Sequence, residues 1–188
     1  MSVLGVTTAT RPQWIAWLRH VGACADAIAW CETQPNKAAA WRNCERGDWM
    51  LWAIGKTVGP PGDDSRKPLV MAACECARLA LPYLPAGEQR PLAAIETAEA
   101  WCRGDATLNQ VRAAASYAAY AYAAAAPAYA YAAHVAAAAA AAAYAAYATY
   151  ADADARTITL RQCADIVRKH FPKPPRVPRQ PVGLGGEE

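Results

Sequence analysis

The sequence lacks the patterns by which most enzymes and metalloproteins are identified. No cysteines are spaced C-x-x-C, and Cys74 and Cys76 in "CEC" would point to nearly opposite sides of a helix. The glycine-rich "GLGGEE" has no strand before it and no helix after it, so it is not a phosphate loop. His134 lies among alanines, and no serine or cysteine stands in a known nucleophile context. We therefore expect a protein that is not an enzyme and that holds no metal or cofactor.

Signals for membranes, export and nucleic acid are also scarce. The formal net charge is only +3, which is too small to predict nucleic-acid binding. The opening "MSVLGVTTATRPQW" is too polar and short for an export signal, and no alanine-free apolar run reaches membrane-spanning length. The seven cysteines are odd in number and show no disulfide spacing, so we expect reduced thiols. These features predict a cytoplasmic protein with neither a nucleic-acid nor a membrane partner.

Strand patterns are nearly absent, whereas signals for helix ends are frequent. β-Branched and aromatic residues never alternate over a useful run. Pro12, Pro68 and Pro91 are suited to a first helical turn, and Gly104 is suited to a helix C-terminus. Asp48 and Thr107 are expected N-caps, and Thr107 has Gln110 in capping-box spacing. We expect an all-α, single-domain bundle of eight or nine helices over residues 1–171. Residues 172–188 are proline-rich and basic, and we expect a flexible tail there.

About forty residues between Ala113 and Ala153 are almost all alanine and tyrosine. Alanine has the highest helix propensity, so this tract predicts a long helical segment that serves as scaffold. Pro127 has no N–H to donate and clashes with the preceding turn, so the segment should be kinked or broken there. A hairpin and a kinked rod remain equally open. Close alanine packing could also join two subunits, which makes a homo-oligomer a second expectation.

Several charged residues of the middle third lie on helices that are otherwise apolar. Glu75 and Arg78 are the only polar residues of "LVMAACECARLAL". Glu96 and Glu99 form a second stripe, which suits an ordinary exposed face with Glu99 reaching Arg103. Charges in apolar surroundings need partners or a wet cavity. The favoured interpretation is a buried ion-pair network that fixes helix register.

The alternative interpretation is a cavity between the helices. Its walls would be Trp49, Trp52 and Trp101, and its arginines would bind an anion. Asp48, with Arg46 two residues before it, and Arg90, directly before a proline, would lie near this cavity.

Four segments resemble one known family. "RGDWMLW", "LVMAACECARLAL", "RPLAAIETAEAWCRGDATLNQVRAAA" and "LRQCADIVRKHFP" are similar to motifs of the alanine-rich immunity proteins of bacteria, phages and other mobile genomes. The resemblance covers about residues 22–172 and implies an all-helical, non-enzymatic protein that binds a toxin. The motif positions carried over are Asp48, Trp49, Trp52, Arg78, Arg90, Glu96, Glu99 and Trp101.

Two functions follow from these observations. The first is an immunity-like protein that neutralises a protein toxin or effector by binding it. The alternative is a phage-borne counter-defence protein that sequesters a small anionic or nucleotide signal in a cavity lined by tryptophan and arginine. The residues expected to bind the partner or ligand are the eight motif positions together with Glu75.

Overall fold

The structure is a computed structural model that describes residues 13–83, 86–123 and 153–177. Throughout these ranges the regular structure is helical and contains no strand. The α-helices are α1 (Gln13–His20), α2 (Ala25–Glu32), α3 (Lys37–Asn43), α4 (Gly47–Gly55), α5 (Lys67–Arg78), α6 (Arg90–Arg103), α7 (Leu108–Ala123) and α9 (Ala153–His170). Short 3₁₀ helices, η1 (Asp64–Arg66) and η2 (Leu81–Tyr83), flank α5. The all-α prediction is confirmed, whereas Pro127 and its expected kink lie outside the described residues.

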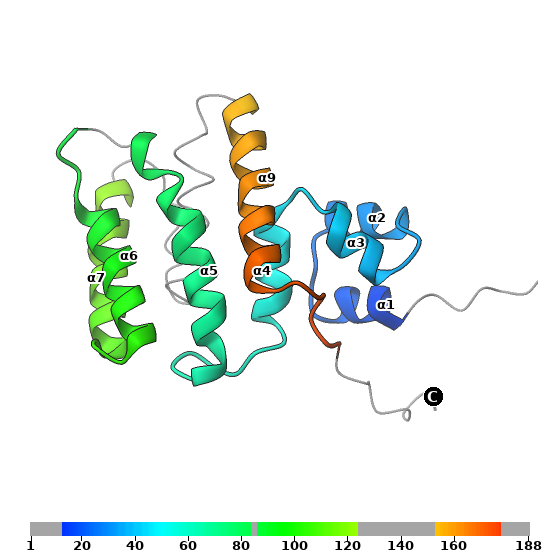
Figure 1. The fold of residues 1–188 in the computed structure, drawn as a ribbon, viewed down its shortest axis with the longest axis horizontal. Coiled ribbons are helices and arrows are strands. Elements are labelled where there is room, and N and C mark those ends of the chain that lie inside the picture. Colours follow the sequence, from blue (N-terminus) through cyan, green and yellow to red (C-terminus); the bar gives the residue numbers. More distant parts are fainter. Residues whose placement is uncertain (1–12, 84–85, 124–152, 178–188) are drawn as a thin grey trace, which may run out of the picture.

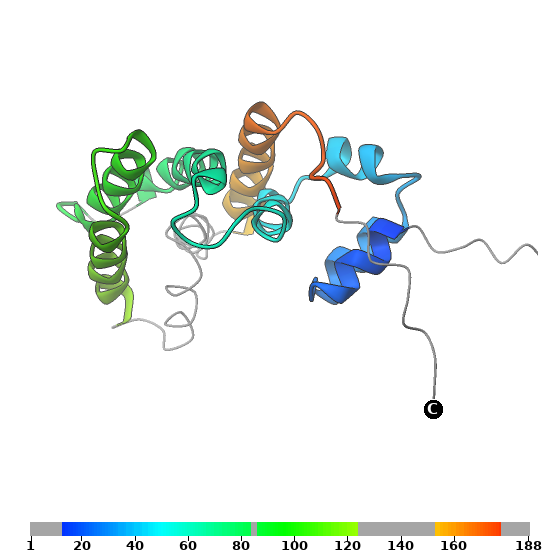
Figure 2. The same cartoon turned by 90° about the horizontal axis from the view of Figure 1, so that it is seen from below.

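The helices pack side by side along the long axis of the molecule. Figure 1 shows α6 and α7 at one end, α5 beside them, α4 and α9 in the middle, and α1 to α3 at the other end. The view from below in Figure 2 keeps this order. Helix α5 contacts α6, α9 and α4, and α4 contacts α9, so one domain is built around α5. No helix in the described ranges is long and apolar enough to cross a membrane.

Small side chains form the centre of the main core. On α5, Ala72, Ala73 and Cys76 are fully buried, as expected for a helix that is apolar on nearly every side. Leu160, Cys163, Ala164 and Val167 of α9 are also buried and form the apolar face of that helix. Alanine and cysteine leave little bulk between the helices, so their backbones can approach closely.

Several predicted helix ends are confirmed. Gly104 ends α6 in the left-handed conformation, with φ of 92°. At the start of α7, the N–H of Thr107 donates to Oε1 of Gln110 at 2.7 Å, and the N–H of Gln110 donates to Oγ1 of Thr107 at 3.3 Å. The expected N-cap at Asp48 is wrong. The N-cap of helix α4 is Arg46, two residues earlier, and Asp48 lies in the first turn of the helix, where its carboxylate accepts a hydrogen bond from the Arg46 side chain.

Candidate functional site

An ion pair between two helices engages two of the predicted site residues. Nε and Nη2 of Arg78 on α5 donate to Oε1 and Oε2 of Glu99 on α6, at 2.9 and 2.8 Å. These hydrogen bonds raise the pKa of Arg78 above its ordinary value. The expected contact of Glu99 with Arg103 is wrong, because Arg103 instead pairs with Asp105 at 3.2 Å. The Arg78–Glu99 pair therefore fixes α5 against α6 rather than stabilising α6 alone.

Glu75 connects α5 to a different helix. One of its oxygens accepts a hydrogen bond from Nζ of Lys169 at 2.9 Å, and the other lies 2.8 Å from Nε2 of His170, both at the end of α9. These contacts, that with His170 first, lower the pKa of Glu75 below its ordinary value. Glu75 and Arg78 lie three residues apart on α5, yet they bind side chains of different helices.

Two further predicted residues form local pairs. Asp48 accepts hydrogen bonds from Nε and Nη2 of Arg46 at 2.9 and 2.6 Å, and the Arg46 guanidinium lies 4.2 Å from the centre of the Trp49 ring. Arg90 pairs through two nitrogens with Glu88, which lowers the pKa of Glu88 to about 2. Five of the six charged site residues are thus paired, but they form separate, partly exposed pairs rather than one buried network, and Glu96 is exposed.

A cavity of about 670 Å³ lies among α1 to α4 and residues 174–177 and reaches the start of α5. We call it the tryptophan cavity, because its walls include Trp14, Trp17, Trp30, Trp41, Trp49 and Trp52. The rings of Trp30 and Trp49 lie 6.2 Å apart and are tilted by 56°. Trp41 donates through Nε1 to the carbonyl oxygen of Phe171 at 2.9 Å, which holds the chain after α9 against the cavity. Pro174, Pro175 and Val177 line it from that side.

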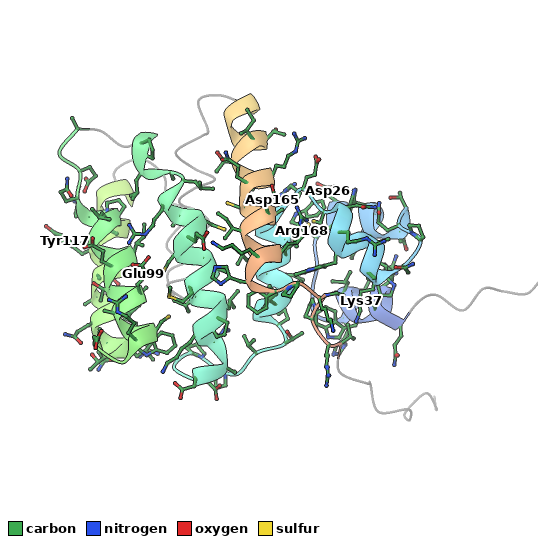
Figure 3. The ribbon with its side chains drawn as sticks, in the orientation of Figure 1. Asp26, Lys37, Glu99, Tyr117, Asp165 and Arg168 are labelled. Atoms are coloured by element: carbon green, nitrogen blue, oxygen red, sulfur yellow. The ribbon has the colours of Figure 1, made fainter. Side chains whose placement is uncertain are left out.

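The structure divides the nine predicted site residues into two groups. Asp48, Trp49 and Trp52 line the tryptophan cavity. The other six, Glu75, Arg78, Arg90, Glu96, Glu99 and Trp101, do not. Figure 3 shows this separation. Lys37, which also lines the cavity, lies at the end of the molecule with α1 to α3, whereas Glu99 and Tyr117 lie toward the opposite end. Glu96 is exposed, and Trp101 is half-buried, with Nζ of Lys67 5.9 Å from its ring centre.

The sequence analysis did not identify the cations of the cavity, which are Lys37, Lys56 and Arg66. Arg66 belongs to "VGPPGDDSRKP", which resembles an ordinary loop by its glycines and prolines, yet it lies in η1 with only 9% of its surface exposed. The sequence contains one signal for this cavity, because six of the seven tryptophans fall within residues 14–52. Their convergence on one cavity depends on tertiary packing.

Two of the thiols that line the cavity, Cys31 and Cys44, are poor candidates for nucleophilic catalysis. Burial raises the pKa of Cys31, at the cavity wall, to about 11, and burial also raises the pKa of Cys44. Such thiols are poor nucleophiles near neutral pH. Within the described ranges, no three His, Cys, Asp or Glu residues are grouped so that they could hold a metal ion.

The chain matches a model of a known protein family. Residues 60–162, more than half of the chain, match the family model described as Imm-5 like putative immunity protein. No curated protein and no solved structure matches. The matched segment includes Arg78, Arg90, Glu96, Glu99 and Trp101. It starts after α4, so Asp48, Trp49 and Trp52 lie outside it.

Proposed function

Because the chain belongs to the Imm-5 like putative immunity protein family, we propose that it binds a protein toxin and neutralises it without catalysing a reaction. The family match is the observation that carries this proposal. The ion pairs support it, because Glu75 and Glu99 bind basic side chains of neighbouring helices and so serve packing rather than proton transfer.

The proposed mechanism is occlusion of the toxin by a broad surface. A stable interface buries about 800 Å² on each partner, and its binding energy is concentrated in a few aromatic or arginine side chains. Tyr117 on α7 is 65% exposed and lies within the matched segment. Ile158 on α9, 54% exposed, is a second apolar side chain available to a partner.

The test uses a candidate toxin chosen from the genes that neighbour the gene for this chain. Co-expression should restore growth of a bacterial host, and the two purified proteins should elute together as one complex. Tyr117→Ser should weaken the complex if α7 contributes to the interface, whereas Arg42→Gln, on the exposed side of α3, is the matched surface control. Full toxin activity in the presence of excess purified chain would contradict the proposal.

A second candidate function is sequestration of a small anionic molecule, and the tryptophan cavity favours it. Its volume of about 670 Å³ lies within the usual range for small-molecule sites. The two functions differ in where affinity resides. A single substitution in the cavity should abolish sequestration, but it should alter occlusion of a toxin only slightly. A thermal-shift screen with small anions distinguishes them, since a bound ligand raises the melting temperature.

A further inference from the structure

Arg66 is a buried cation at the wall of the tryptophan cavity. Only 9% of its surface is exposed, and its Nε makes no hydrogen bond with any part of the chain that the structure describes. A guanidinium is always charged, so burying one of its donors without a partner is unfavourable. Most buried polar groups have a partner, so an exception of this kind requires an explanation.

The nearest acidic side chains in the sequence and in the cavity do not accept a hydrogen bond from Nε of Arg66, although the pKa of Asp63 is lowered by its hydrogen bonds with Ser65 and, to a smaller extent, by the charge of Arg66. Asp48 accepts two hydrogen bonds from Arg46. Asp63 accepts one from the backbone N–H of Ser65 at 2.8 Å, and Asp64 pairs with Lys67 at 2.8 Å. None of these three carboxylates therefore provides a hydrogen-bonded partner for the buried Nε of Arg66.

The other cations of the cavity increase the positive charge of its lining. Nζ of Lys56 lies 5.2 Å from the ring centre of Trp52, and Nζ of Lys37 donates to the carbonyl oxygen of Pro175 at 3.2 Å. Against these two lysines and Arg66 stands a single lining carboxylate, that of Asp48. This excess of positive charge, surrounded by apolar side chains of low dielectric constant, attracts an anion.

The tryptophan walls of the cavity determine which chemical group the ligand should contain besides its anionic group. Six indole rings offer flat apolar surfaces, against which another aromatic ring packs by stacking or edge contacts. All six come from residues 14–52, before the family match begins at residue 60, so family membership does not imply this site. A long aliphatic chain would use flat walls less well than a planar ring.

We propose that the tryptophan cavity binds a small planar aromatic molecule with one anionic group, a carboxylate or a phosphate, and that Arg66 pairs with that group. The proposal rests on the second candidate function, sequestration, and specifies its ligand class and its anion-binding residue. A guanidinium can donate two parallel hydrogen bonds to either anion, which gives the ring a defined orientation between the indoles.

Calorimetric titration of the full chain tests the proposal with two matched pairs of probes. Indole-3-acetate is compared with neutral 3-methylindole, and adenosine 5′-monophosphate is compared with adenosine. The wild-type protein should bind at least one anion about tenfold more tightly than its neutral counterpart, the difference that a charge-assisted pair supplies. Arg66→Gln should remove that preference, whereas Arg42→Gln should retain it.

The possible results test the ligand class and the role of Arg66 separately. If neither anion binds more tightly than its neutral counterpart, both sequestration of an aromatic anion and the role of Arg66 are overturned. If an anion is preferred and Arg66→Gln binds it equally well, the role of Arg66 alone is overturned. Circular dichroism checks that Arg66→Gln is folded, and the wild-type comparison does not depend on that variant. The toxin assay is independent of both results.

Discussion

Gly47 of α4 faces Cys163 of α9 with no space for an additional carbon. A β-carbon on Gly47 would lie 2.4 Å from Cβ of Cys163 and 2.6 Å from the backbone nitrogen of Ala164. Atoms at this separation overlap, and a backbone atom cannot move aside as the end of a flexible side chain can. The close approach of α4 to α9 therefore requires glycine at this position.

Gly47→Ala should destabilise the protein by about 2 kcal/mol, as overpacking in a core does. The sign is informative, because alanine in an exposed helix is favoured over glycine by about 1 kcal/mol. Chemical unfolding monitored by circular dichroism measures the change. Gly55→Ala in the same helix is the control, since its β-carbon would lie 3.7 Å from Cδ2 of Leu69, an ordinary contact. Equal stability of the two variants would contradict the close approach.

Features that depend on local sequence could be predicted. The capping of α7 by Thr107 and Gln110 and the end of α6 at Gly104 depend on residues a few positions apart. The partner of Glu99 could not be found in this way. Helical spacing pointed to Arg103, but α5 brings Arg78 to Glu99 from 21 positions away in the sequence.

The cavity shows the same limit of local patterns. The sequence suggested Trp49 and Trp52 as wall residues, and both line the cavity. It also suggested Trp101, which lies on α6 and does not. Which tryptophans converge depends on how α1 to α4 pack together, and periodicity within one helix carries no such information.

The Arg78–Glu99 pair should contribute measurable coupling between α5 and α6. We expect about 1 kcal/mol in a double-mutant cycle of Arg78→Gln and Glu99→Gln, the upper end for partly exposed pairs, because both hydrogen bonds are short and parallel. The Arg103–Asp105 pair is the matched control, since both side chains are more than half exposed and share one contact. A coupling no larger than that of the control would mean that the Arg78–Glu99 pair is not maintained in solution.

The contribution of Glu75 to stability should depend on pH. Its pKa is lower in the folded protein than the ordinary value of 4.5, because His170 and Lys169 stabilise the carboxylate. The unfolded chain therefore takes up a proton first as the pH falls, and this stabilisation is complete above about pH 4.5 and is lost below it. The melting temperature of wild type should exceed that of Glu75→Gln near neutral pH, and the gap should close in acid. Glu96→Gln, at an exposed site on α6, controls for the loss of one negative charge. A gap that is the same at every pH would show that the carboxylate of Glu75 is not held by α9.

The seven cysteines should differ sharply in reactivity, because only Cys24 is exposed. Burial raises the pKa of Cys74 to about 12, and burial raises that of Cys31 to about 11, so neither thiol forms much of the reactive thiolate at about pH 8. An aromatic disulfide reagent should label Cys24 rapidly in the folded protein, and the four buried thiols only as the chain unfolds. Cys24→Ser should remove the rapid phase, whereas Cys74→Ser should leave it intact. Rapid labelling of Cys74, Cys76 or Cys163 in wild type would mean that the α5–α9 core opens far more readily than its close packing allows.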